Sequence, residues 1–203
     1  AWERRAEHPL LDMALFAQNR VFAFSNLAAL VNYAATFAVG FLLSLYFQSV
    51  RGLSPQAAGG LLTAQPLVMA ALSPFAGRLS DRVDPRIVAS SGMGLIAVGL
   101  ALLALVSPAT PFAFLVACLL LLGAGFALFS SPNTNAVMAS VEKRSYGVAS
   151  ATLATMRLVG QMLSMGVASL VLALFVGREA VGPDRSAGFV AGMRAAFALY
   201  ALL

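Results

Sequence analysis

Gly77-Arg78-Leu79-Ser80-Asp81-Arg82-Val83-Asp84-Pro85-Arg86 is the stretch with the densest charge in this sequence, and it separates two long apolar runs. Lys and Arg accumulate in the cytoplasmic loops of membrane proteins. The basic character of a short loop between two membrane-length segments therefore indicates on which side of the bilayer the loop lies. We therefore expect the loop over residues 77–86 to be cytoplasmic, and the other segments can be oriented from it.

The composition indicates that this chain is surrounded by lipid. Of its 203 residues, 60% are hydrophobic and 10% are charged, whereas soluble proteins carry about 25% charged residues. A net charge of +5 can indicate a nucleic-acid partner. Here the Arg residues lie mostly between apolar runs without interleaved aromatic residues, so we expect no nucleic acid and interpret the charge as a topology signal.

Six apolar runs have the length of membrane-spanning helices, which need about 20 residues each. The expected spans are residues 21–48, 55–76, 85–106, 112–139, 147–176 and 187–203. The runs are continuous and about twice as long as the strands of a membrane barrel. The sequence therefore predicts an all-α polytopic membrane protein with a cytoplasmic tail or linker over residues 1–20 and a six-helix bundle over residues 21–203.

Local signals and charge counts support this organisation. Ser54-Pro55 and Asp84-Pro85 each place a capping residue before a proline suited to the first helical position. Eight Lys and Arg residues fall on the same side as the 77–86 loop and three on the other, which is the positive-inside pattern.

We expect a multi-pass protein of the plasma (inner) membrane. The first 20 residues are polar, unlike a signal peptide, and both ends look cut, so we expect part of a larger protein.

Polar residues within the spans are candidates for a transport path. In the first span, small or polar residues recur every four positions and so lie along one stripe of a helix: Asn32, Thr36, Gly40, Ser44 and Gln48. We expect Asn32, Thr36 and Gln48 to line a water-filled path. The alternative is ordinary helix packing, because small and hydroxyl residues mediate helix contacts in lipid.

Two other spans carry proline beside polar side chains. The second span contains Gln65-Pro66, and the fourth contains Ser131-Pro132-Asn133-Thr134-Asn135. Proline frees a backbone carbonyl and bends a helix, and interrupted helices build the binding sites of transporters. Gln65, Asn133 and Asn135 are therefore path candidates, with a purely structural kink as the alternative.

Arg157 lies about 10 residues into the fifth span, roughly 15 Å from its start. A central Arg costs about 2.5–3.5 kcal/mol on insertion scales, so we expect it to face a cavity or a partner. The six expected spans contain no Asp or Glu. Its counter-group is then substrate, water, backbone carbonyls or a carboxylate elsewhere in the protein, and a structural role is the alternative. Next to it, Gly160 and Ser164 begin a small-residue seam typical of helix packing.

Enzyme motifs are nearly absent. The single His8 lies in the tail, and no metal-binding His-Glu-x-x-His sequence occurs. Asp81-x-x-Asp84 is only superficially similar to the metal-binding acidic pairs of prenyl-transferring membrane enzymes, because Arg residues flank it. We expect no enzymatic activity, no cofactor and no metal site.

Gly77-x-Leu79-x-Asp81-Arg82, between a second and a third helix, resembles the cytoplasmic motif of the major facilitator superfamily. The motif ends in Asp84-Pro85-Arg86 rather than Gly-Arg, as is common in the copy in the C-terminal half of the family. Further positions over nearly all of residues 9–203 resemble the fourteen-helix drug:proton antiporter branch: Tyr46-x-Gln48, Gly52-x-Ser54, Gly59, Pro66, Ser131-Pro132-Asn133-x-Asn135, Gly147 and Arg157-x-x-Gly160.

The resemblance implies that these are the last six helices, packed as one of two pseudo-symmetric bundles whose N-terminal partner half is missing. It implies alternating access, with a small-molecule substrate bound between the halves. It also implies a gating role for the cytoplasmic motif: Gly77, Arg78, Leu79, Asp81, Arg82 and Arg86. Asp81 would latch the cytoplasmic side at a neighbouring helix start, for which Tyr146-Gly147 is the nearest candidate, because a carboxylate is favoured at a helix N-terminus.

We therefore expect a secondary active transporter that exports drugs or other amphiphilic or cationic compounds and is driven by protons. Because the spans lack carboxylates, the proton-titrating group would lie in the missing half, and this chain alone should not transport. The alternatives are a transporter of one specific metabolite and a non-transporting scaffold or sensor with the facilitator fold.

Overall fold

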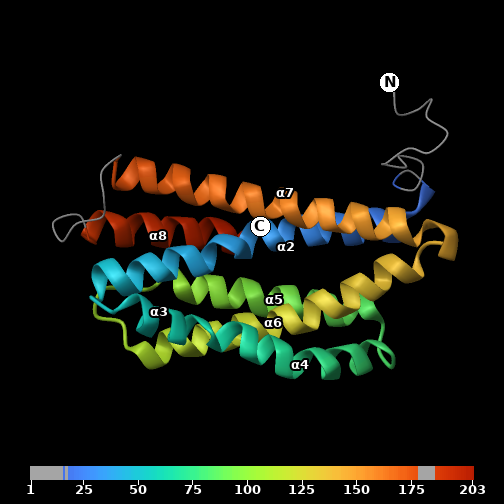
Figure 1. Cartoon of the computed structure of the whole chain (residues 1–203), viewed down its shortest axis with the longest axis horizontal. Coiled ribbons are helices and arrows are strands. Elements are labelled where there is room, and N and C mark those ends of the chain that lie inside the picture. The colour runs from blue at the N-terminus through green and yellow to red at the C-terminus, as the bar shows by residue number, and fades with distance from the viewer. Residues whose placement is uncertain (1–15, 17, 178–185) are drawn as a thin grey trace.

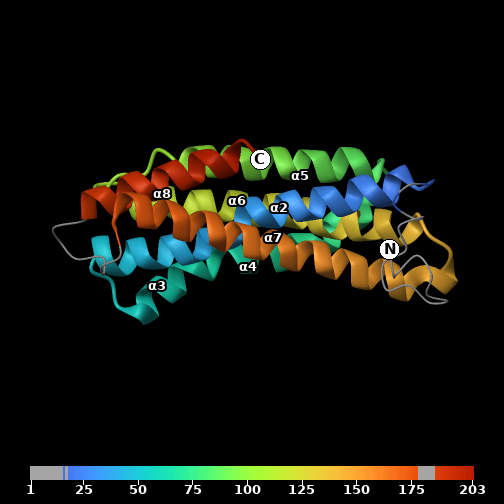
Figure 2. The same cartoon turned by 90° about the horizontal axis from the view of Figure 1, so that it is seen from above.

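The computed structural model describes residue 16 and residues 18–177 and 186–203. Within these residues the regular structure is helical and no strand occurs, so the predicted all-α class is confirmed. The helices lie side by side in an elongated bundle (Figures 1 and 2). Their bounds are α2 Arg20–Leu45, the π-helical turn η2 Tyr46–Val50, α3 Pro55–Leu62, α4 Ala64–Ser80, α5 Pro85–Leu103, α6 Phe112–Ala139, the 3-10 turn η3 Lys143–Ser145, α7 Tyr146–Phe175 and α8 Ser186–Ala201.

Five stretches of the described residues are long and apolar enough to cross a membrane: Arg20–Val50, Pro55–Ser80, Pro85–Leu103, Phe112–Ala139 and Lys143–Phe175. The sixth expected span corresponds to α8, which has 16 residues and is shorter than the roughly 20 residues of a full crossing. Most of the expected tail, including Arg4 and Arg5, lies outside the described residues, as do Arg178 and Arg185 of the loop before α8.

Several helices begin where a capping side chain satisfies a free backbone N–H. The Asn19 side chain accepts a hydrogen bond from the Phe22 backbone at the start of α2 (3.0 Å). Ser54 accepts from the Ala57 backbone before α3, and Asp84 accepts from the Arg86 backbone before α5. Both cap-then-proline starts predicted from the sequence are therefore observed.

The loop within the basic stretch over residues 77–86 is shorter than expected, because α4 extends beyond residue 76, the expected end of the second span, whereas α5 begins at Pro85 as expected. Helix α4 continues to Ser80, so Gly77, Arg78 and Leu79 form part of its last turn. Pro85 and Arg86 already belong to α5, which leaves a four-residue turn over 81–84. The physical reason is that Arg78 is favoured near the negative end of the helix dipole, and the Ser80 hydroxyl donates to the Gly77 carbonyl (2.8 Å).

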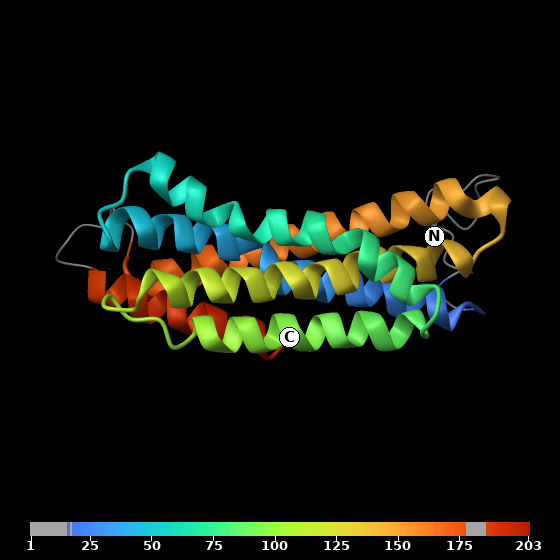
Figure 3. The same ribbon diagram turned by 90° about the horizontal axis from the view of Figure 1, so that it is seen from below.

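The second span is broken at Thr63, where α3 meets α4. Pro66 has no backbone N–H to donate to the Leu62 carbonyl. The Thr63 hydroxyl instead donates to the Gly60 carbonyl (2.6 Å). Figure 3 shows α3 inclined away from the line of α4, so the span is a bent pair of helices and not a straight rod.

The core lies between α2, α5, α6 and α8, whereas α4 and α7 flank the bundle. Helix α6 packs on both α4 and α5, and α2 packs on α7. In the most apolar 18-residue segment of each span, 50% is buried inside the bundle for the spans formed by α2 and by α6. The corresponding share is 6% for α3–α4 and 17% for η3–α7. Helices α4 and α7 therefore carry the widest uncovered surfaces among the five long spans.

Candidate functional site

Arg157 on α7 is held by side chains from two other helices. Its Nη2 donates a hydrogen bond to the Thr134 hydroxyl on α6 (2.7 Å). Its guanidinium carbon lies 5.6 Å from the centre of the Tyr33 ring on α2, within the range of a cation–π contact. The structure thus places this charge where α2, α6 and α7 meet.

Both partners of Arg157 are themselves fixed. The Thr134 hydroxyl donates to the Ser130 carbonyl one turn earlier on α6 (2.8 Å), so its oxygen lone pairs are free to accept from Arg157. The Tyr33 ring packs edge-on against Phe126, with 5.5 Å between ring centres. The guanidinium therefore contacts two oriented groups.

The hydrogen-bonding capacity of Arg157 is not used up by these contacts. Its Nε is buried and has no hydrogen-bond partner among the described residues. Among the residues that the structure describes, the Asp and Glu side chains are Asp81, Asp84 and Glu142, and all three are exposed. Glu142 pairs with Arg144 (2.8 Å), and no ion pair joins a described acid to Arg157. An unpaired buried donor costs about 1–3 kcal/mol, which a ligand that accepts from Nε would recover.

The polar residues of the stripe expected on the first span differ in their hydrogen bonding: some are bonded within their own helix, and one has an atom without a hydrogen-bond partner. The Thr36 hydroxyl donates to the Asn32 carbonyl of its own helix (2.7 Å), and both side chains are buried. The Asn32 side-chain oxygen has no partner among the described residues. Thr36 is thus explained by local helix bonding, whereas Asn32 keeps a free acceptor in the bundle interior.

The two glutamines of the predicted path lie apart from Arg157 or lack a defined role. Gln48 lies in η2, 15 residues beyond Tyr33 and so roughly 22 Å along the helix. Its amide donates to the Ser44 hydroxyl on the same helix (2.9 Å). Gln65 is half-buried on α4, one residue before the proline of the bent span. The structure does not bring either residue into the Arg157 cluster.

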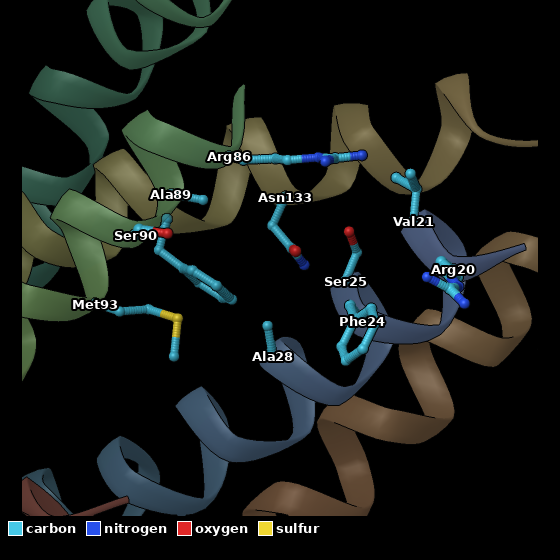
Figure 4. Close-up of a pocket in the computed structure, with 11 residues that line it drawn as sticks. Arg20, Val21, Phe24, Ser25, Ala28, Arg86, Ala89, Ser90, Met93 and Asn133 are labelled. Atoms are coloured by element: carbon cyan, nitrogen blue, oxygen red, sulfur yellow. The ribbon is translucent and has the colours of Figure 1, made fainter. Parts of the chain in front are cut away.

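The two asparagines of α6 point to different surroundings. Asn133 is buried and lines a cavity of about 450 Å³ between α2, α5 and α6; Figure 4 shows its side chain directed between α2 and α5. Its amide nitrogen has no partner among the described residues. Asn135 is exposed. The intervening Thr134, which the sequence analysis did not select, is the residue that contacts Arg157.

The cavity carries basic residues that the sequence analysis assigned to other roles. Arg20 from α2 and Arg86 from α5 both line it, together with the hydroxyl residues Ser25 and Ser90. Arg20 is one of the eight basic residues expected on the cytoplasmic side, and Arg86 is one of the residues expected in the gating motif. Their combination depends on how α2 and α5 each pack on α6, and the spacing of residues along the chain does not predict that.

The residues expected to form a gating motif lie at the same end of the bundle as this cavity, which Arg86 itself lines. Arg78, Leu79, Asp81 and Arg82 are exposed. A Cβ added to Gly77 would lie 3.5 Å from the Ser131 hydroxyl, so the end of α4 packs on α6. No hydrogen bond or ion pair joins the Asp81 side chain to another described residue, and its latch to Tyr146-Gly147 stays a prediction.

The small-residue seam of α7 lies against α2. A Cβ on Gly160 would collide with the Leu30 carbonyl. The Ser164 hydroxyl accepts a hydrogen bond from the Ala38 backbone (3.0 Å), and its carbonyl accepts one from the Tyr200 hydroxyl (2.6 Å). Gly160 and Ser164 thus lie at a helix-packing interface that holds α7, and with it Arg157, close to α2.

The chain is similar to known membrane proteins over most of its length. The family model described as Major Facilitator Superfamily matches residues 26–203. "Riboflavin transporter RibZ" of Clostridioides difficile (strain 630) is 34% identical over 155 residues, which cover 76% of this chain and 34% of that protein. "Uncharacterized transporter YebQ" of Escherichia coli (strain K12) is 34% identical over 168 residues, which cover 82% of this chain and 36% of that protein.

A third relative is named for multidrug resistance. "Multidrug resistance protein Stp" of Mycobacterium tuberculosis (strain ATCC 25618 / H37Rv) is 28% identical over 174 residues, which cover 86% of this chain and 32% of that protein. The chain therefore spans about a third of the length of the curated relatives that it matches.

Proposed function

Because the chain belongs to the major facilitator superfamily of transporters, we propose that it forms the C-terminal half of a secondary active transporter. Residues 21–203 are the six-helix bundle of that half, and residues 1–20 are a tail or linker. The degenerate ending of the cytoplasmic motif supports the C-terminal assignment. The widely uncovered helices α4 and α7 supply the surface on which an N-terminal half would dock.

The transported compounds are drugs or other amphiphilic molecules, exported by alternating access and driven by protons. The relative named "Multidrug resistance protein Stp", of Mycobacterium tuberculosis, supports this substrate class. No Asp or Glu lies inside a described membrane-length helix. The group that takes up the proton therefore belongs to the N-terminal half.

The observation that carries the transport proposal is the Arg157 cluster. A charged residue inside a membrane segment is costly and generally marks a substrate or ion pathway. Here Thr134 and Tyr33 hold the charge between three helices, and its Nε has an open hydrogen bond. A purely structural Arg would be expected to have this donor satisfied within the bundle.

The orientation follows from the positions of the basic residues. The start of α2, the end of α4, the turn after it, the start of α5 and η3 lie at one end of the bundle (Figure 1). These segments carry Arg20, Arg78, Arg82, Arg86, Lys143 and Arg144. We place this end in the cytoplasm and the bundle in the plasma (inner) membrane, in agreement with the positive-inside rule.

A second candidate function is the transport of one specific metabolite. The relative named "Riboflavin transporter RibZ" supports this alternative, and substrate choice depends on both halves of such a transporter. The two candidates share the fold, the membrane orientation and the alternating-access cycle, and differ only in the compound carried.

The test uses the full transporter, expressed in cells that lack their own efflux pumps. We expect low accumulation of a fluorescent lipophilic cation, and a return to high accumulation when a protonophore collapses the proton gradient. Accumulation equal to that of cells with an empty vector would contradict drug efflux. In that case riboflavin uptake and export in the same cells decide whether the metabolite alternative replaces it.

A further inference from the structure

We propose that Arg157 binds a carboxylate carried by some of the transported compounds, so that the substrate class includes amphiphiles with a planar anionic group, zwitterions among them. This inference rests on the proposed transport function and adds the chemistry of the substrate. The guanidinium has the right geometry, because its planar fork of N–H donors matches the two oxygens of a carboxylate.

The contacts within the protein leave this fork incomplete. Arg carries five N–H donors, and Thr134 accepts from Nη2 alone. Nε is buried without an acceptor in the described part of the chain. The aromatic face of Tyr33 attracts the positive charge but accepts no hydrogen bond in the plane of the guanidinium. A planar ligand with two acceptor oxygens supplies what is missing.

The side chain is also held in place before any ligand arrives. Gly160, one turn after Arg157 on α7, packs against the backbone of α2 at Leu30, so α7 cannot move away from Tyr33 without breaking that contact. Thr134 is anchored on α6 by its own bond to Ser130. A charge fixed by neighbours in this way binds a ligand with less loss of side-chain freedom.

Other arginines of the described chain differ from Arg157. Arg51 donates to the carbonyls of Pro108 and Thr110 (2.9 and 2.7 Å) and lies over the Phe112 ring. Arg194 is exposed, and its Nε donates to the Ala104 carbonyl (2.9 Å). Arg194 therefore provides a matched control for Arg157: it also lies within a hydrophobic helix, but its Nε is satisfied by the backbone.

The experiment measures binding, which does not require transport. Rhodamine 110 carries a free carboxylate, and rhodamine 123 is its methyl ester with the same fluorophore. We would titrate the purified full transporter into each dye and follow fluorescence anisotropy for wild type, Arg157→Gln, Arg157→Lys, Thr134→Val and Arg194→Gln. Size-exclusion chromatography of each variant reports on folding.

We expect Arg157→Gln to weaken rhodamine 110 binding at least about tenfold, as for the loss of a buried charge-assisted pair, and to change rhodamine 123 binding less than about twofold. Arg157→Lys keeps the charge but loses the planar fork, so it should be intermediate. Thr134→Val should weaken rhodamine 110 binding about threefold through the freed guanidinium. Arg194→Gln should leave both dyes unchanged.

The contrary outcomes are distinct. If Arg157→Gln weakens the binding of both dyes equally, Arg157 does not recognise the carboxylate of the ligand and the inference is overturned. If wild type does not prefer rhodamine 110, or if Arg157→Gln leaves its affinity unchanged, the inference is also overturned. If this preference persists in a protein that shows no proton-driven efflux in cells, only the proposed drug efflux fails.

Discussion

Gly92 of α5 and Gly125 of α6 face each other across a crossing at which neither helix has room for a side chain. A Cβ on Gly92 would lie 2.6 Å from the Gly125 carbonyl oxygen, and a Cβ on Gly125 would lie 2.8 Å from the Gly92 carbonyl oxygen. Membrane helices lack a hydrophobic driving force for association and depend on such close backbone approach. The two glycines therefore set the separation of α5 and α6.

Gly92→Ala should destabilise the protein by about 1–3 kcal/mol, because the added methyl group forces the helices apart. Gly94 is the matched control: it lies on the same helix, and apart from the adjacent residues and backbone of that helix, no atom of the described chain lies within 4 Å of its added Cβ. Gly94→Ala should be neutral or slightly stabilising, since Ala is the better helix former. Thermal unfolding in detergent measures both variants, and equal midpoints would contradict the crossing described above.

Tyr46→Phe should cost about 1 kcal/mol of stability. The Tyr46 hydroxyl donates to the Ser107 carbonyl in the turn between α5 and α6 (2.7 Å), and the ring is fully buried. Removal of the hydroxyl leaves that carbonyl without its donor. Tyr146→Phe serves as the control, because Tyr146 is exposed. Unfolding by heat or denaturant that ranks the two variants in the opposite order would show that the hydrogen bond contributes nothing.

Asp81→Asn should shift the balance between inward-open and outward-open states of the full transporter. The proposed latch pairs the Asp81 carboxylate with a helix N-terminus, an interaction worth about 0.3–1 kcal/mol at an exposed site. The corresponding change in the state ratio is about twofold to fivefold, measurable by cysteine accessibility on the cytoplasmic side. Glu142→Gln, which breaks an exposed pair with Arg144, is the control. Unchanged cysteine accessibility and unchanged transport in Asp81→Asn would contradict the proposed latch.

This chain by itself should not move substrate across a membrane. If the N-terminal half provides both the second wall of the pathway and the proton-titrating group, liposomes containing only residues 1–203 should show no dye flux driven by a proton gradient. The full transporter in the same liposomes is the positive control. Proton-driven flux by the isolated chain would show that coupling resides in these helices and would refute the proposed division of roles.

Local chemistry along the chain predicted some features well. The starts of α3 and α5 at Pro55 and Pro85 follow from a capping side chain and a proline, which act within a few residues. The end of α4 did not follow, because hydropathy falls at Gly77 whereas the helix continues through Ser80. Apolar composition predicts the lipid-embedded portion of a helix, but hydrogen bonding and the dipole decide its last turn.

The cluster around Arg157 was only partly predictable from the sequence. The rarity of Arg inside an apolar run singled out Arg157. Its partners could not be identified in this way, because Thr134 and Tyr33 reach it from two other helices. The sequence favoured the amides of Asn133 and Asn135, which the fold directs elsewhere. A side chain's neighbours depend on helix rotation and crossing, and the spacing within one helix does not fix either.

The π-helical turn at Tyr46–Val50 affects how this sequence should be compared with others. Such a turn holds one more residue than a regular α-helical turn. A homologue with a regular helix at this point should therefore be one residue shorter between Tyr33 and Arg51. An alignment that is anchored at Tyr33 and has no gap there would pair Arg51, which donates to carbonyls of the turn before α6, with the wrong position. It would also shift the positions from the π-helical turn to Arg51 by about a quarter of a helical turn.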